Sequence, residues 1–148
     1  MNEQESYNIL SIGSVRGTAH NLRLEINPEF RPALKGLSQF SHCQVLWWLH
    51  EFAEDHFRQT TQIQPPYDAT LTGVFASRSP IRPNPIGLSV AAILSVDVDS
   101  GIVEVAGFDA YPGTPVLDIK AYFPSADRVM EVTVPDWAAA WGDWTANH

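Results

Sequence analysis

Short apolar stretches separated by turn-forming residues follow one another along the whole chain. Alternation of apolar and polar positions, rich in β-branched and aromatic residues, is typical of half-buried strands. The strands that this pattern predicts cover residues 7–16, 21–26, 45–52, 71–75, 87–98, 102–108, 116–119 and 129–134. Because Asp99-Ser100-Gly101 is a turn sequence, we expect residues 87–98 and 102–108 to form a hairpin.

Helix is rare in this pattern. Asn27-Pro28-Glu29 combines a capping residue, a proline in the first turn and an acid beside the positive end of the helix dipole, and Gly36 would end such a helix. A second helix is expected to begin at Pro135-Asp136. We expect residues 53–70 to form a mobile connection between strands. Many short strands with little helix favour one mainly all-β domain over residues 1–148, a sandwich or barrel rather than a doubly wound α/β fold.

Length and composition fit an ordinary globular domain. The chain has 148 residues, of which 45% are hydrophobic and 18% charged, and this excludes the disordered and collagen-like classes. No apolar run is long enough to span a bilayer, and the N-terminal residues are acidic where a signal peptide is basic. A single cysteine, Cys43, fits a reducing compartment. We therefore expect a cytoplasmic protein with no membrane partner.

The charge balance bears on the kind of partner. Nine Lys and Arg against seventeen Asp and Glu give a formal net charge of −8. Affinity for nucleic acid comes largely from Lys and Arg side chains that neutralise phosphates. The sequence as a whole therefore argues against tight nucleic-acid binding, although a local basic patch on an acidic protein is compatible with it.

The segment with the clearest chemistry runs from residue 73 to residue 89 and reads GVFASRSPIRPNPIGLS. Three prolines within six residues restrict its backbone, so we expect a stiff loop. A stiff loop loses little entropy when a ligand binds, and Arg78 and Arg82 can pair with a carboxylate or phosphate in forked geometry. The alternative is a rigid turn between two strands whose arginines are simply solvated.

Three blocks of the sequence resemble the TrmO/YaeB (TsaA-like) family of S-adenosylmethionine-dependent methyltransferases. The Pro-rich segment matches the family signature except at Ser77, where the family has threonine. Residues 113–127, GTPVLDIKAYFPSAD, match a second block except at Ala121, where the family has proline. Residues 36–42, GLSQFSH, followed by a strand that ends at His50-Glu51, match a third. Three blocks in the right order are a far more specific signal than one short motif.

The resemblance implies a compact antiparallel β-barrel that binds S-adenosylmethionine, usually as a homodimer. The family's best known activity is N6-methylation of threonylcarbamoyladenosine at tRNA position 37. Carried over motif by motif, the resemblance implies cofactor contacts from His50, Glu51, Arg78, Arg82, Asn84, Leu88, Pro112, Gly113, Thr114 and Pro115. It also implies that Asp118, Lys120 and Tyr122 line or brace the same site.

The chemistry that follows from this resemblance asks little of the protein. A sulfonium carries its own leaving group, so the chain has to position the reactants in line and remove a proton from the acceptor. Asp118 and His50 are both candidate bases, and Lys120 is the third catalytic candidate.

Two features leave the methyl acceptor open. The chain lacks the P-R-Q-P-G-L-V-type segment that family members carry after their first strand, and residues 16–21 lead directly to the second strand. Together with the net charge of −8, this favours a small-molecule or other non-tRNA acceptor as the alternative to tRNA. A non-catalytic module that binds S-adenosylmethionine is a further alternative, and a purely structural barrel would leave the polar Pro-rich loop unexplained.

Metal and thiol chemistry fit the sequence less well. The spacing of His42, His50 and His56 matches neither H-E-x-x-H nor a two-Cys two-His site, so no metal site is expected. Cys43 lies at the head of an apolar strand and is expected to be a buried small residue rather than a nucleophile.

The tryptophans fall into two groups. Trp47 and Trp48 are adjacent on a strand and must point to opposite faces, one into the core and the other toward a cofactor, a base or a partner chain. Trp137, Trp141 and Trp144 recur at helical spacing, which predicts a helix packed on the barrel or on a second chain.

Overall fold

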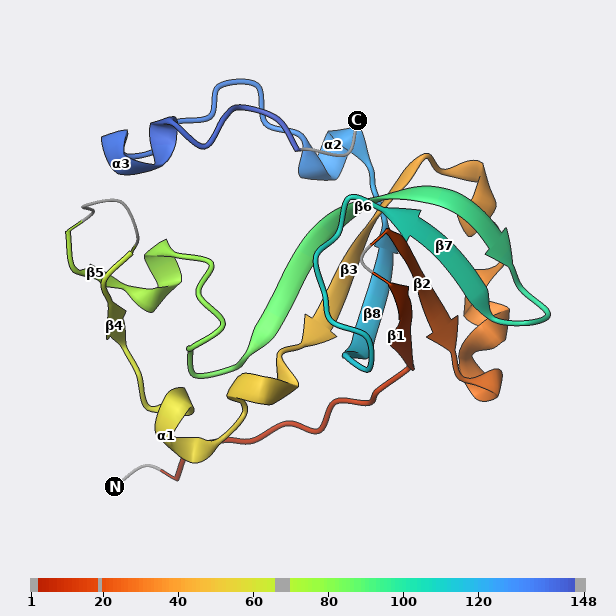
Figure 1. Cartoon of the computed structure of the whole chain (residues 1–148), viewed down its shortest axis with the longest axis horizontal. Helices are drawn as coiled ribbons and strands as arrows, with labels where there is room; N and C mark the ends of the chain where they lie inside the picture. The colour runs from red at the N-terminus through yellow and green to blue at the C-terminus, as the bar shows by residue number, and fades with distance from the viewer. Residues whose placement is uncertain (1–2, 19, 66–69, 146–148) are drawn as a thin grey trace.

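Six antiparallel strands close into a barrel in the order β1-β2-β7-β6-β3-β8 in the computed structural model of the chain (Figure 1). The structure describes residues 3–18, 20–65 and 70–145. The barrel strands are β1 (Gly13–Thr18), β2 (Asn21–Ile26), β3 (His42–Trp48), β6 (Ile86–Asp97), β7 (Ile102–Ala106) and β8 (Pro115–Ala121). The mainly β class and the compact antiparallel barrel are therefore confirmed, as is the hairpin of β6 and β7.

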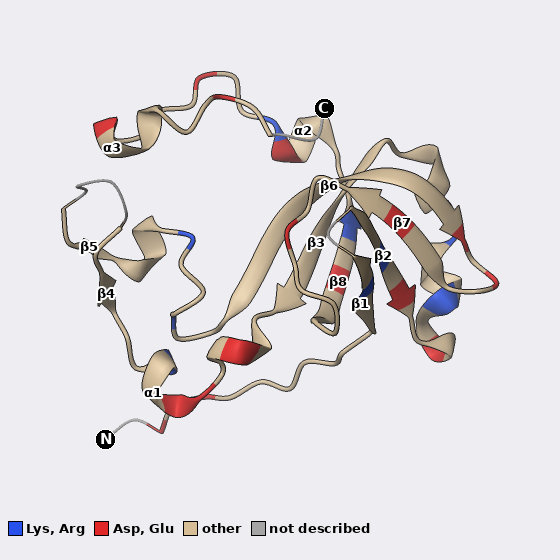
Figure 2. Cartoon of the chain, in the orientation of Figure 1, with Lys and Arg blue, Asp and Glu red and all other residues tan. Residues whose placement is uncertain are grey.

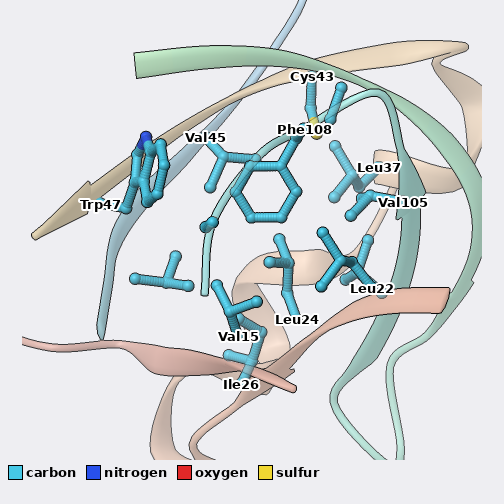
Figure 3. Close-up of a cluster of buried hydrophobic side chains, with 14 of the residues drawn as sticks. Val15, Leu22, Leu24, Ile26, Leu37, Cys43, Val45, Trp47, Val105 and Phe108 are labelled. Atoms are coloured by element: carbon cyan, nitrogen blue, oxygen red, sulfur yellow. The ribbon is translucent and has the colours of Figure 1, made fainter. Parts of the chain in front are cut away.

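Apolar side chains at alternate strand positions fill the barrel interior, and Figure 3 shows this cluster. Each of the six barrel strands contributes a completely buried residue, namely Val15, Leu24, Val45, Ala91, Val103 and Val116. Such alternation follows from the two-residue period of a strand, which points successive side chains to opposite faces. Closure of the barrel also pairs both sides of every barrel strand, so the sheet has no free edge.

The expected strand over residues 7–16 is wrong at its start. Pairing of β1 begins at Gly13, which lies opposite Ile26, the last residue of β2. There Asn27 and Pro28 turn the chain into a 3-10 helix. Ile12 still accepts the N–H of Asn27 and donates to the Val116 carbonyl, at 2.8 Å each. Residues 7–11 lie before these bonds and belong to no strand.

The expected strand over residues 45–52 also has different bounds, because β3 covers His42–Trp48. Beyond Trp48, the backbone N–H of Leu49 donates a last hydrogen bond to the carbonyl of Pro85, at 2.7 Å. Pro85 has no N–H to return, so the β3–β6 ladder ends and the chain turns into the 3-10 helix η3 (His50–Phe52).

The short helix after the second strand is confirmed, in 3-10 form. It comprises η1 (Pro28–Leu34) and η2 (Leu37–Gln39), separated at Gly36, whose φ of 88° is a conformation that glycine adopts readily. Pro32 lies inside η1 and lacks the N–H that an α-helix would use at that position. Leu34 and Leu37 are buried and belong to the core cluster.

Residues 49–85 form the β3–β6 connection, and its described parts, residues 49–65 and 70–85, extend away from the barrel (Figure 1). After η3 they form α1 (Asp55–Arg58), the two-stranded sheet of β4 (Gln62–Ile63) and β5 (Thr72–Gly73), and η4 (Val74–Ala76). The strand expected over residues 71–75 is thus reduced to two residues, because its partner β4 is only two residues long. Residues 66–69 of the expected mobile connection lie outside the described residues.

After β8 the chain forms α2 (Pro124–Asp127) and later α3 (Asp136–Ala139). The strand expected over residues 129–134 is wrong, since the closed barrel offers no free edge for it to join. A helix does begin at Asp136, but it is a single turn, so of the three tryptophans expected on it only Trp137 lies within it, and Trp141 and Trp144 lie beyond its end. Within the described part of the chain, no helix is both long and apolar enough to cross a membrane.

Candidate functional site

A pocket of about 520 Å³ opens where β3 ends and β6 begins, and we call it the barrel-end pocket. Its walls come from the barrel, from the β3–β6 connection and from the loop between β7 and β8. The lining residues are Trp47, Leu49, His50, Glu51, Phe52, Arg78, Pro80, Arg82, Ile86, Gly87, Leu88, Asp109, Tyr111 and Thr114. Its volume lies within the range of small-molecule and cofactor sites.

Trp47 forms the inner wall of the pocket and is only 9% exposed. Its indole packs edge to face on Phe108, with ring centroids 5.5 Å apart, and covers the backbone of Gly87 on the neighbouring strand. A Cβ at Gly87 would collide with the indole ring, so glycine at this position is what allows the packing. The Trp47 Nε1–H is buried and, among the described residues, has no hydrogen-bond acceptor.

The Pro-rich loop holds two guanidinium groups at the pocket through backbone carbonyls. Arg78 Nη2 donates to the Leu88 carbonyl at 2.6 Å, and Arg82 Nη1 donates to the carbonyls of Ser77 and Ser79 at 3.2 and 2.9 Å. Neither arginine forms an ion pair with a carboxylate of the described residues. Both groups therefore keep their positive charge available for an anionic ligand.

Carboxylates and aromatic rings line the same pocket as these cations. Glu51 lies on η3 and Asp109 on the loop after β7, and both side chains are exposed. Phe52 and Tyr111 add aromatic surface to that of Trp47. Figure 2 shows one acidic position on η3, Glu51, and basic positions along the β3–β6 connection. The lining therefore suits a ligand that carries an anionic group, a cationic group and a flat ring.

Six of the residues expected at the site meet in this pocket. They are His50, Glu51, Arg78, Arg82, Leu88 and Thr114. Sequence reasoning missed Phe52, Asp109 and Tyr111. Asp109 and Tyr111 lie three residues and one residue before Pro112-Gly113-Thr114-Pro115, so an acid and an aromatic residue close to that block were the available signal.

The remaining expected cofactor contacts lie near the pocket but outside its lining. Asn84 lines a second pocket, where its side-chain oxygen accepts a hydrogen bond from Arg58 Nη2 at 2.9 Å. Gly113 forms a turn with φ of 92°, and its N–H donates to the Val15 carbonyl at 2.7 Å. Pro112 and Pro115 flank that turn.

Asp118 and Lys120 lie elsewhere, on the outer face of β8. Their register partners on the adjacent strand β3 are Leu46 and Gln44. The residues that alternate with these two along β3 point into the core, so Asp118 and Lys120 point outward. Asp118 Oδ2 and Lys120 Nζ are 3.0 Å apart, and Asp118 Oδ1 accepts the N–H of Ile119. Of the three catalytic candidates, the structure of one chain thus brings only His50 to the barrel-end pocket.

Several other expectations concern single side chains. Trp48 points outward, opposite to Trp47, and the Arg58 guanidinium lies 5.7 Å from its ring centroid. Tyr122 lies beside His42, with ring centroids 6.5 Å apart. Cys43 is completely buried, and burial raises the pKa of its thiol to about 11, so it is neutral at physiological pH. No three metal-ligating side chains gather within the described parts of the chain.

Comparison with known proteins decides the family. Residues 12–128 match the sequence profile of the tRNA-methyltransferase O N-terminal domain, which is most of the chain. The chain belongs to this family. The match includes the barrel, the Pro-rich loop and the barrel-end pocket, and residues 129–145 lie outside it.

Relatives within the tRNA-methyltransferase O family carry two kinds of name. A probable S-adenosyl-L-methionine-binding protein of Archaeoglobus fulgidus is 41% identical over 114 residues, 77% of this chain and 30% of that protein. A human tRNA (adenine(37)-N6)-methyltransferase is 41% identical over 76% of this chain and 24% of its own length. The crystal structure of TrmO from P. aeruginosa matches with a TM-score of 0.73 and 30% identity, covering 93% of this chain and 64% of that one. The chain thus spans less than a third of the first two relatives.

Proposed function

We propose that this chain is an S-adenosylmethionine-dependent methyltransferase that binds its cofactor in the barrel-end pocket. The observation that carries the proposal is the mixed lining of that pocket, with two guanidiniums free of ion pairs, two carboxylates and aromatic walls. Family relatives named as methyltransferases and as S-adenosyl-L-methionine-binding proteins support it.

The donor groups of the pocket fit S-adenosylmethionine part by part. Arg78 and Arg82 are suited to hold the methionine carboxylate. Glu51 and Asp109 can compensate the ammonium and sulfonium charges. The aromatic side chains of the lining suit the adenine ring. The Trp47 Nε1–H is a buried donor without an acceptor among the described residues, and a polar ligand atom could accept its hydrogen bond after a small shift of the indole ring.

When bound, the cofactor supplies an activated methyl group on a sulfonium that leaves as a neutral thioether. The residues of the chain then have to orient both reactants and take a proton from the acceptor. We assign proton removal to His50, because it is the candidate that lines the pocket. Asp118 and Lys120, on the outer face of β8, would reach a pocket only on a neighbouring chain.

For the acceptor we propose the adenosine N6 of threonylcarbamoyladenosine at tRNA position 37, methylated by a cytoplasmic homodimer. The names of the human and Escherichia coli relatives support a tRNA adenine, and the arginines of the connection provide local positive charge. A non-tRNA acceptor, or binding without catalysis, is the second candidate. The net charge of −8 and the archaeal relatives named only for S-adenosylmethionine binding favour it.

The cofactor assignment is tested by calorimetric titration with S-adenosylmethionine and S-adenosylhomocysteine. Arg78→Ala should weaken binding about 10- to 100-fold, since it removes a charged hydrogen-bond donor. Arg16→Ala is the matched control, because Arg16 lies on β1 beside Glu25 and away from the pocket. A folded wild-type protein that binds neither ligand would overturn the proposal.

The acceptor is tested by transfer of a labelled methyl group to tRNA that carries threonylcarbamoyladenosine. His50→Gln should lower turnover while leaving cofactor affinity nearly unchanged, and His56→Gln, at an exposed position on α1, serves as the control. Cofactor binding without transfer to this tRNA would reject the tRNA assignment and leave the second candidate.

A further inference from the structure

A second pocket, of about 720 Å³, lies beside α1, and we call it the Trp48 pocket. Its lining comes from the last residue of β3, from α1, from the Pro-rich loop and from the segment that precedes β1. Figure 1 shows that segment running past α1 on its way to the barrel. Of the described lining residues, only Ile86 is shared with the barrel-end pocket. The Trp48 pocket is therefore a separate opening outside the proposed cofactor site.

An aromatic ring and a cation are already paired in this pocket. Trp48 points outward from β3 and is half-buried, and the Arg58 guanidinium carbon lies 5.7 Å from the centroid of its ring. Two bonds hold Arg58 there, because its Nε donates to the Pro83 carbonyl at 2.6 Å and its Nη2 donates to Asn84 Oδ1 at 2.9 Å. Arg58 forms no ion pair with a carboxylate of the described residues. Unpaired bases of RNA stack on aromatic rings and on guanidinium planes, and both surfaces are preformed here.

Polar groups of the lining can recognise the edge of a base. Because Asn84 Oδ1 accepts from Arg58, the Asn84 Nδ2 amide remains as a donor, and none of the described residues accepts from it. Asp55 is an exposed carboxylate that can accept a hydrogen bond from an exocyclic amino group. Two carboxylates in one lining, Glu5 and Asp55, disfavour a free phosphate or another anion. The lining therefore suits a neutral flat ring with donors and acceptors on its edge, which is the chemistry of a nucleobase.

The Trp48 pocket and the barrel-end pocket lie next to each other. Ile86, the first residue of β6, lines both of them. On the Pro-rich loop, Arg82 lines the barrel-end pocket and Asn84, two residues later, lines the Trp48 pocket. A single strand of RNA whose reacting base reaches the barrel-end pocket can therefore place a neighbouring base in the Trp48 pocket.

We propose that the Trp48 pocket binds an unpaired nucleobase of the RNA substrate, adjacent to the base that is methylated. This inference rests on the tRNA acceptor assigned under the proposed function. Trp48 supplies the stacking surface, Arg58 the positive charge and Asn84 the hydrogen-bond donor, so all three are positioning residues. Stacking adds affinity to that of phosphate contacts, which a chain with a net charge of −8 supplies sparingly.

The test measures binding of the full chain, with S-adenosylhomocysteine present, to a fluorescently labelled tRNA anticodon stem-loop by fluorescence anisotropy. Trp48→Leu keeps an apolar side chain but removes the ring, and it should weaken RNA binding about 10-fold. Asn84→Ala, at an exposed position that is not expected to affect folding, should weaken it about 3- to 10-fold. Calorimetric titration of Trp48→Leu with S-adenosylmethionine should give nearly the wild-type affinity, because Trp48 does not line the barrel-end pocket.

Trp144→Leu is the matched control, since Trp144 is 80% exposed but does not line the Trp48 pocket, and it should leave RNA affinity unchanged. An abasic site on one side of the target adenosine should weaken binding to the wild type about as much as Trp48→Leu does. The same abasic RNA should lose little further affinity for Trp48→Leu, because both changes remove the same contact.

The outcomes separate this inference from the proposed function. Methyl transfer to tRNA with RNA binding that is insensitive to both Trp48→Leu and Asn84→Ala would overturn the inference alone. RNA binding that depends on Trp48, by a chain that transfers no methyl group to tRNA, would support the inference and reject only the methylation of tRNA. A folded wild-type protein that binds no RNA would overturn both the inference and the tRNA acceptor.

Discussion

The barrel and the β3–β6 connection are ordered by different forces. Barrel strands are joined by hydrogen-bonded ladders around a core whose members, such as Val15, Leu24 and Val45, are completely buried. The connection contributes only three buried residues among those described, Pro65, Val74 and Pro85. Yet the connection carries much of the polar lining of the barrel-end pocket. The barrel therefore provides most of the hydrophobic stabilisation, and the connection provides many of the polar groups available to a ligand.

Order in the connection comes from prolines and from arginines bonded to backbone carbonyls. Arg58 Nε donates to the Pro83 carbonyl at 2.6 Å, and Arg82 ties the loop back to Ser77 and Ser79. Proline lowers the entropy of the unfolded loop, and each arginine replaces water with protein acceptors. Such a loop can present charge without a hydrophobic core of its own.

The largest expected effect is on the stability of the barrel. Leu24→Ala leaves a cavity at a completely buried site and should lower the free energy of unfolding by about 3 kcal/mol. Leu71→Ala, on the connection and 60% exposed, should change it by no more than about 0.5 kcal/mol. Urea denaturation measures both. Equal losses of unfolding free energy at the two sites would contradict this difference, because they would mean that side chains of the connection stabilise the fold as much as the barrel core does.

A second prediction concerns Gly87, where the barrel wall and the pocket meet. Gly87→Ala drives a methyl group into the Trp47 indole and should cost about 1–3 kcal/mol of stability. The displaced ring should also weaken S-adenosylmethionine binding. Thermal denaturation and calorimetric titration measure the two effects.

Gly73→Ala is the matched control for that substitution. Gly73 lies on β5 with φ of −67°, and the nearest atom to an added Cβ is 3.9 Å away. Alanine is therefore compatible with the backbone there, and stability should stay constant or rise slightly. If both alanine variants behaved alike, the close packing of Trp47 on Gly87 would not limit stability or binding.

The sequence predicts the barrel far better than its surroundings, because strand periodicity reports on burial. Residues 21–26 and the β6–β7 hairpin fall close to their expected places. Expectations fail where an apolar stretch has no partner strand. Residues 129–134 look like a strand but meet a closed barrel, and residues 71–75 find a partner of only two residues.

The site could be predicted only in part, for a related reason. Motif resemblance finds Arg78, Arg82 and His50 because their local sequence is distinctive. It cannot show that Asp118 and Lys120 face outward from β8, although they are two and four residues from the core position Val116, a spacing that on a regular strand would point them inward. A bulge between Leu46 and Trp47 shifts the pairing of β3 with β8, so the outward direction depends on a register that local patterns do not encode.

The smallest expected effect is at the β6–β7 turn, the place where the barrel itself depends on local polar bonds. Backbone N–H groups of Ser100 and Asp99 donate to Asp97 Oδ1 at 3.3 and 3.0 Å, and these bonds hold the pKa of the Asp97 carboxyl below its ordinary value. Because the folded pKa is lower than the unfolded one, the stabilisation is complete above the ordinary pKa of aspartate and is lost as pH falls through the folded value. Asp97→Asn should therefore be slightly less stable than wild type at neutral pH, and the difference should disappear in acid. Thermal denaturation of both proteins across this pH range measures it. A difference that persisted at low pH would mean that the charge of Asp97 does not stabilise the turn.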